Sequence, residues 1–218
     1  MKKSGRYKTS HLVEDQYQPG SGGRVLLNLP GIKRKREMDK IEGQEQARAL
    51  EELVGIYGKN HGFNAADVSR IHQIWLARIY SWAGKYRQVN ITKGNFSFAA
   101  SQHVPTLMSE FEKEPLAKYT PCNFQSEDEI CNALAVVHAE LVLIHPFRDG
   151  NGRAARLLTT LMAIQAGLPP LDFGGLKGKM KQRYFSAVRA ALERNYKPMK
   201  QIFRSVVRRT MRRFGRLR

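Results

Sequence analysis

Apolar residues recur at helical spacing along most of the chain. Val68, Ile71, Trp75 and Ile79 follow one another at intervals of three or four residues, so they share one face of a helix. Asn64 precedes this face and is a residue type that caps helix N-termini. Similar patterns predict further helices near residues 37–56, 102–113, 130–144, 151–166, 179–194 and 198–213. The chain is therefore predicted to be mainly α.

Residues 87–98 have a different pattern, which is typical of strands. The apolar positions here are Val89, Ile91, Phe96 and Phe98. Gly94 and Asn95 lie between them and favour a tight turn. We expect one small β-hairpin in a single, otherwise helical domain.

A dense polar run follows the most apolar of the predicted helices. Ser126 and Glu129 form a capping box at the start of that helix, and Pro146 disfavours helix at the residue before it. The run reads His145, Pro146, Phe147, Arg148, Asp149, Gly150, Asn151, Gly152, Arg153, Ala154, Ala155 and Arg156. A second apolar helix, predicted to begin near Asn151, comes next. A polar segment between two core helices indicates a functional site.

The residue types in this run fit a polyphosphate. Gly150 and Gly152 allow close approach to the backbone, and the N-terminus of the next helix attracts anions. Arg153 and Arg156 are three residues apart and can bind the same anion. Asp149 repels phosphate directly but can hold Mg²⁺ that bridges to it. His145 titrates near neutral pH and can accept a proton from a hydroxyl, which makes it the candidate base.

The run resembles the Fic family motif, H-P-F-x-[DE]-G-N-G-R-x-x-R, at every defined position. An upstream segment is also similar to the family, as is the hairpin, which resembles the family's flap; the resemblance covers residues 25–207. The upstream matches are Ile71, His72, Ile79, Tyr80, Ser81, Trp82, Ala83, Gly84 and Arg87. The resemblance implies a Fic-type helical fold and a protein adenylyltransferase, which moves AMP from ATP to a Tyr, Thr or Ser hydroxyl of a target protein.

The resemblance also implies a role for each residue. His145 is the general base, Asp149 holds Mg²⁺, and Arg153 and Arg156 hold the β- and γ-phosphates. The backbone of Gly150 and Gly152, with the Asn151 side chain, stabilises the α-phosphoryl charge. The flap residues expected to cover the nucleotide are Thr92, Lys93, Gly94 and Asn95. Lys93 fits a solvated hairpin tip equally well.

Three further aromatic or histidine positions keep structural alternatives. Tyr184 lies where the family places an aromatic residue near adenine, but its helical pattern also fits the core. His72 and His138 are expected to be packed structural histidines.

Many Fic proteins carry an inhibitory helix, [ST]-x-x-x-E-[GN], whose glutamate pairs with the second motif arginine. The nearest match here ends in Glu42 and Gly43, but Met38 occupies the Ser/Thr position. We therefore expect Glu42 not to inhibit the enzyme effectively. The resemblance instead implies a toxin restrained by a separate small antitoxin.

The chain is strongly basic, with a net charge of +18. Residues 1–24 are polar and are expected to form an extended arm, and residues 208–218 a basic C-terminal tail. This charge leaves a nucleic-acid-binding protein as an alternative, although the motif does not require nucleic acid. Fic-fold transfer of another nucleotide or of a phosphate group is a second alternative. No apolar run is long enough for a membrane span, so a cytoplasmic location, with possible delivery to another cell, is the expectation.

Overall fold

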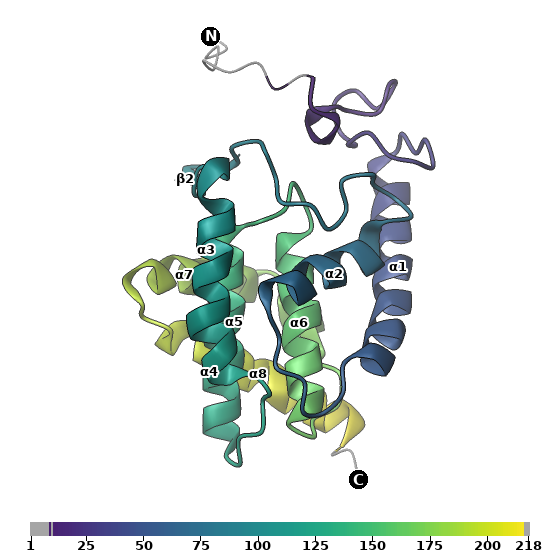
Figure 1. Cartoon of the computed structure of the whole chain (residues 1–218). Helices are drawn as coiled ribbons and strands as arrows, with labels where there is room; N and C mark the ends of the chain where they lie inside the picture. The colour runs from purple at the N-terminus through teal and green to yellow at the C-terminus, as the bar shows by residue number, and fades with distance from the viewer. Residues whose placement is uncertain (1–8, 10, 216–218) are drawn as a thin grey trace.

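The computed structural model describes residue 9 and residues 11–215. Seven of its segments are helices of eight or more residues, and they pack around a central one, α5 (Glu127–Ile144) (Figure 1). α5 contacts α6 (Asn151–Gln165), α7 (Lys179–Ala190), α8 (Lys197–Phe214) and α3 (Val104–Phe111). The mainly α prediction is confirmed.

The central position of α5 follows from its sequence. The predicted capping box is present: Ser126 Oγ accepts a hydrogen bond from the Glu129 N–H. Most residues of α5 are buried, from Ile130 to Ile144. A helix that is apolar on all sides is stable only when other helices surround it. α5 therefore ends inside the protein, and this places His145 at the bottom of a site rather than on the surface.

A second pair of helices supports the motif helix from the other side. α1 (Lys35–Ile56) packs against α2 (Ala65–Leu76), and both contact α6. Asn64 caps α2 as predicted, in a capping box with Asp67. Trp75 of α2 is fully buried and reaches the start of the motif helix.

The predicted hairpin is confirmed but is short. β1 (Thr92–Lys93) pairs with β2 (Phe96–Ser97) in antiparallel register, Thr92 opposite Ser97 and Lys93 opposite Phe96. Gly94, with φ of 59°, makes the turn. One further backbone hydrogen bond, from the Phe98 N–H to the Ile91 carbonyl (3.1 Å), continues the pairing beyond the strands. Beyond it, the Arg87 side chain donates to the carbonyl groups of Val89 and Ala99, which lie on opposite arms of the hairpin.

The predicted N-terminal arm differs from the structure in its described part. Residues Val13–Asp15 form a 3-10 helix, and Tyr17 forms an isolated bridge with Leu26. The Glu14 side chain is buried and accepts a hydrogen bond from the Gln88 N–H (2.6 Å). This polar anchor, which sequence periodicity does not reveal, folds the segment back onto the domain. Residues 1–8 and 10 of the expected arm lie outside the described residues.

Two other boundaries differ from expectation. α8 continues to Phe214, so residues 208–214 of the expected tail are helical, whereas 216–218 lie outside the described residues. After α3 the chain continues through a π-helical turn, Glu112–Leu116, into α4 (Ala117–Tyr119). Pro115 is accommodated because the wider turn does not require its missing N–H. Among the described residues, no helix is both long and apolar enough to cross a lipid bilayer.

Candidate active site

His145 occupies the C-cap of α5 in a left-handed conformation, with φ of 54°. Such a backbone is strained for a residue with a side chain and is held here by its surroundings. The ring Nδ1 lies 3.0 Å from the Val142 carbonyl, which can only accept, so Nδ1 carries the proton. Nε2 therefore carries the lone pair, and this atom is buried with no partner among the described residues. This tautomer is the one that a general base requires.

The surroundings of His145 keep its ring neutral. Burial lowers the pKa of His145 to about 3, and the positive charge of Lys93 acts in the same direction. The Phe98 ring stacks on the imidazole, with centroids 3.7 Å apart and planes at 20°. Phe98 follows the flap strand β2 and thus links the flap to the candidate base.

The loop after His145 is held by its own motif residue Asn151. Asn151 Oδ1 accepts from the Phe147 N–H (2.8 Å), and Nδ2 donates to the Phe147 carbonyl (2.7 Å). The side chain is buried. The resemblance implies that this amide stabilises the phosphoryl charge. In the structure both polar atoms bind the Phe147 backbone, so Asn151 fixes the shape of the loop. Because Nδ2 has a second N–H, contact with the phosphoryl group stays a prediction.

Two other buried side chains fasten the same loop to the rest of the domain. The Arg87 Nε donates to the His145 carbonyl (2.7 Å). His72 Nδ1 accepts from the Gly84 N–H (2.9 Å), so its Nε2 carries the proton and donates to the Asp149 carbonyl (3.1 Å). His72 also stacks on Phe147, with centroids 3.8 Å apart. His72 is therefore a packed histidine, as predicted, and it positions the loop.

The two motif glycines meet different requirements. Gly150 has φ of 80°, and a Cβ there would lie 2.8 Å from the Trp75 ring. No larger residue fits, because the loop presses against the core. A Cβ at Gly152 would meet nothing within 4 Å, so open space lies over the first turn of α6. The N–H groups of a first helical turn have no intrahelical partner, and an anion can occupy this space.

The two motif arginines have different neighbours. Arg153 Nη1 lies 2.5 Å from the Glu42 carboxylate, and its guanidinium lies over the Trp75 ring, 4.7 Å from the centroid. Arg156 faces Phe173 and Tyr184, at 5.4 and 6.0 Å, and has no carboxylate partner among the described residues. Thus Glu42 pairs with the first motif arginine, and the second remains free.

Asp149 fits a Mg²⁺ ligand. Burial tends to raise the pKa of Asp149, but the Arg153 charge and the Gly150 N–H outweigh it and hold that pKa below its usual value. Its side chain is 38% exposed, at the edge of the site. Among the described residues, no group of three or more His, Cys, Asp or Glu side chains is arranged to hold a metal ion. One ionised carboxylate suits Mg²⁺, which takes most of its ligands from water and phosphate.

A cavity of about 300 Å³ connects the flap, the motif and α7. Its wall includes Lys93, Phe98, His145, Gly152 and Tyr184. Tyr184 is buried and shares a hydrogen bond with His138 Nε2 (2.9 Å), as its core interpretation predicts. It also borders the cavity, and its contact with adenine stays a prediction. Thr92, Gly94 and Asn95 do not line this cavity in the present flap conformation.

Three residues of this site have roles that their sequence pattern does not indicate. Arg87 belongs to the matched upstream segment but its pattern gives no partner, and Phe98 reads simply as a strand residue. Glu14 accepts from Gln88 through its side chain, and its carbonyl accepts from Arg148 Nε (2.9 Å). All three act through contacts between distant segments, which no local pattern encodes.

We expect the free energy of unfolding to fall as the pH is lowered from 7 to 5. Burial lowers the pKa of His72 to about 4, and those of His138 and His145 to about 3. Below pH 6.5 these histidines bind protons in the unfolded chain but stay neutral in the folded chain. The free energy of unfolding therefore falls as the pH falls. The expected loss is about 2 kcal/mol per histidine at pH 5.

Urea denaturation at several pH values measures this loss. His138→Gln removes one of the three groups and should reduce the pH dependence by about a third. His103→Gln is the control, because His103 is exposed. Equal pH dependence in the two variants would contradict the assignment of His138 as a neutral buried histidine.

Residues 62–163 match the Fic/DOC family. Of the curated relatives, protein adenylyltransferase VbhT of Bartonella schoenbuchensis is 30% identical over 145 residues, which are 66% of this chain and 30% of VbhT. The probable protein adenylyltransferase y4lH of Sinorhizobium fredii is 26% identical over 147 residues, or 67% of this chain and 74% of that protein. This chain thus spans about a third of VbhT.

Solved structures agree with the sequence matches. The N-terminal Fic domain of a VirB-translocated Bep effector from Bartonella quintana, with bound ADP, superposes with a TM-score of 0.70 at 25% identity, covering 90% of this chain and 95% of that one. The helical fold with its hairpin, the family match and these neighbours agree. The protein contains a Fic/DOC family domain.

Proposed function

We propose that this protein is a protein adenylyltransferase that moves AMP from ATP to a hydroxyl side chain of a target protein. The relatives named above carry that activity in their names. The observation that carries the proposal is the tautomer of His145: a neutral ring with its lone pair on Nε2, on the wall of a cavity that also borders Gly152. A base at this position, beside an anion site, suits attack of a hydroxyl on a phosphoryl group.

In the proposed reaction, Nε2 of His145 accepts the proton of the target hydroxyl. The oxygen forms a bond to the α-phosphorus of ATP, the bond between that phosphorus and the bridging oxygen breaks, and pyrophosphate leaves. The N–H groups of the first turn of α6 face the phosphoryl charge, and Arg153 and Arg156 hold the departing phosphates. Asn151, Arg87 and His72 keep the loop in shape.

Asp149 would hold Mg²⁺ together with the phosphates. When bound, this ion would neutralise part of the charge on the leaving pyrophosphate. The chain's own contribution is a single ionised carboxylate, kept in place by the Gly150 N–H (2.8 Å).

The flap controls access to the base in this proposal. Phe98 covers the imidazole, and Nε2 is buried. The target hydroxyl therefore reaches Nε2 after the Phe98 ring moves aside, which couples target binding at the hairpin to exposure of the base. Thr92, Gly94 and Asn95 would cover the nucleotide when the flap closes over it.

A small antitoxin remains part of the proposal, with this chain as the toxin. The support is Arg156, which lacks a carboxylate partner among the described residues. An inhibitory glutamate from a separate protein would find that guanidinium free. We place the reaction in a cytoplasm, which supplies ATP and protein targets.

Incubation of the protein with radiolabelled ATP and a cell lysate tests the function. Label at the α-phosphate should appear on a protein target, and label at the γ-phosphate should not. Mass spectrometry then identifies the target and the modified residue. Transfer of γ-label would instead show a kinase, and lack of both labels with every lysate tried would contradict the proposed activity.

Arg153→Ala should weaken ATP binding by about tenfold or more, because a charge-assisted contact to phosphate contributes about 1.5–3 kcal/mol. Isothermal titration calorimetry measures the affinity. Arg78→Ala is the control, since Arg78 is 67% exposed and makes one long ion pair, 3.8 Å from Glu45. An unchanged affinity in Arg153→Ala would remove Arg153 from the phosphate site.

A further inference from the structure

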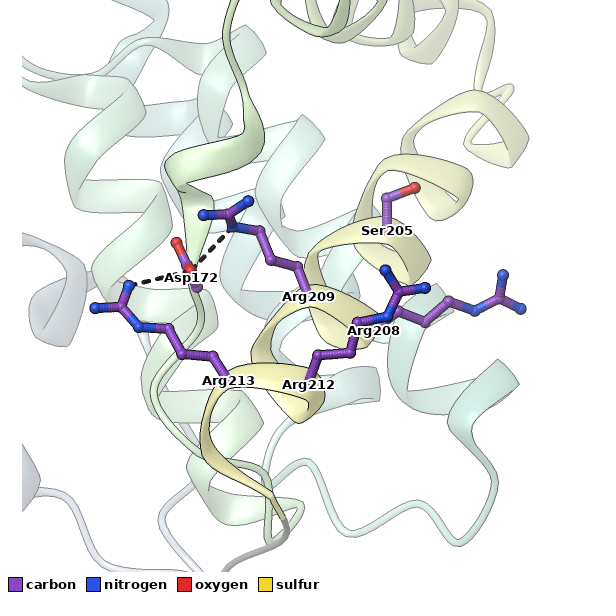
Figure 2. A pocket seen from close by; sticks show the side chains of 6 residues that line it. All are labelled: Asp172, Ser205, Arg208, Arg209, Arg212 and Arg213. Atoms are coloured by element: carbon purple, nitrogen blue, oxygen red, sulfur yellow. Dashed lines mark hydrogen bonds and ion pairs between the residues drawn. The ribbon is translucent and has the colours of Figure 1, made fainter.

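Two adjoining hollows lie along α7 and α8, away from the motif. The first, of about 570 Å³, is lined by Asp172, Ser205 and four arginines: Arg208, Arg209, Arg212 and Arg213 (Figure 2). The second, of about 780 Å³, lies between the two helices and includes Lys179, Arg183 and, again, Ser205. Because Ser205 borders both, the two hollows adjoin, and together we call them the α7–α8 trough.

The arginines of the trough are of two kinds. Arg209 and Arg213 bind Asp172, at 2.9 and 3.2 Å, as the dashed lines in Figure 2 show. Arg208 and Arg212 are exposed, lie four residues apart on one face of α8 and have no acidic partner among the described residues. Two guanidinium groups are thus available to an incoming anion, and two more become available if Asp172 is displaced.

The surrounding charge is nearly all of one sign. From residue 177 onward the sequence contains fifteen Lys and Arg residues and one acid, Glu193. The remainder of the chain is close to neutral by comparison. A hollow that is lined by like charges concentrates the positive field and attracts a polyanion.

The shape of the trough selects among polyanions. Cations line both of its hollows, Lys179 and Arg183 in one and Arg208 and Arg212 in the other. This arrangement suits an extended chain of phosphates better than a single phosphate group. A membrane-binding helix presents a continuous row of exposed apolar residues beside its basic face. On α8 most apolar residues, from Met199 to Val207, are buried in the core, and Phe214 at its end is exposed. The basic residues line hollows rather than a flat face, which favours a strand over a membrane surface.

We propose that the α7–α8 trough binds the phosphate backbone of a nucleic acid strand. Arginine forms paired hydrogen bonds with phosphate oxygens, and backbone contacts of this kind do not depend on base sequence. Tyr184 and Val188, on another face of α7, border the catalytic cavity. The strand therefore lies about one helix away from the active site, and its binding does not require the motif.

Fluorescence anisotropy with a labelled single-stranded RNA of about 20 nucleotides measures this binding, on the whole protein and at several salt concentrations. Arg208→Gln combined with Arg212→Gln should weaken binding at least tenfold. The slope of log affinity against log salt should fall by about 1.4, since two phosphate contacts are lost. Arg36→Gln combined with Lys40→Gln is the matched control, because these residues are also exposed, four apart and helical.

A second pair of variants tests the role of Asp172. Asp172→Asn should raise the affinity for RNA, because it releases Arg209 and Arg213. Glu193→Gln removes the same amount of charge but releases neither arginine, so it should raise the affinity less. His145→Ala should bind RNA as the original protein does, which separates this proposal from the enzymatic one. Two outcomes would overturn the proposal. The first is an equal loss of RNA affinity in the two double variants. The second is binding of a polyglutamate peptide or of anionic lipid vesicles that is as tight as RNA binding and depends as strongly on Arg208. Duplex DNA in place of RNA shows which nucleic acid binds more tightly.

Discussion

Replacing His145 by alanine is expected to lower the rate of target labelling by about 10²–10⁴-fold, the usual contribution of a general base. ATP affinity should stay nearly unchanged, because the ring acts on the incoming hydroxyl and not on the nucleotide. Nδ1 is bound to Val142 and Nε2 is unpartnered, so the imidazole contributes no hydrogen bond to other described residues. Labelling with α-labelled ATP and calorimetry of ATP binding measure the two quantities separately.

Two controls make this result specific. His103→Ala removes an exposed histidine and should label targets at the original rate. Circular dichroism should show that His145→Ala remains folded, since Arg87 still binds the carbonyl of residue 145 through its own side chain. A His145→Ala protein that labels targets at the original rate would show that another group, or water, takes the proton.

The helices could be predicted from sequence because their signals are local. The Asn64 and Ser126 caps, the apolar face of α2 and the uniformly apolar α5 each specify an element without reference to the rest of the chain. The folded N-terminal segment could not be predicted in this way. Glu14 is one carboxylate in a polar stretch, and what orders it is the Gln88 N–H, 74 residues away.

In the candidate site, too, local sequence predicts some features and contacts between distant segments determine the others. The motif predicts roles for His145, Asp149, Gly150 and the two arginines, because their order in the chain is itself the signal. It does not show which atoms are already occupied. The Asn151 amide binds the Phe147 backbone, and the Phe98 ring stacks on His145, the candidate base; both contacts depend on the three-dimensional path of the loop and the flap. Residue identity thus indicates the chemistry, and contacts between segments determine which residues are free to perform it.

The sequence pattern and the structure differ most at Glu42. The partial inhibitory pattern would pair this glutamate with Arg156, yet Glu42 Oε2 lies 2.5 Å from Arg153. The Tyr80 hydroxyl donates to the other oxygen (2.8 Å), and the Trp75 indole N–H donates to the Glu42 carbonyl (2.9 Å). The side chain is buried. Glu42 therefore joins α1 to the motif helix and holds Arg153 over Trp75, while Arg156 has no carboxylate partner among the described residues.

Glu42→Gln is expected to reduce the free energy of unfolding by about 3 kcal/mol, because a buried ion pair loses one partner. It should not activate the enzyme. Urea denaturation measures the first quantity, and auto-labelling at equal concentrations of folded protein measures the second. Glu45→Gln, on the same helix, is the control, since Glu45 pairs with the partly exposed Arg48.

The activity measurement decides what Glu42 does. An inhibitory glutamate competes with the phosphates of ATP, so its removal would raise auto-labelling by orders of magnitude. A gain above about tenfold, equal to ~1.4 kcal/mol in the barrier, would therefore show self-inhibition. A glutamate that positions Arg153 has the opposite effect: its removal frees the guanidinium to move and weakens ATP binding. We expect this second outcome, because the pair that the fold builds includes the first motif arginine and leaves the second unblocked.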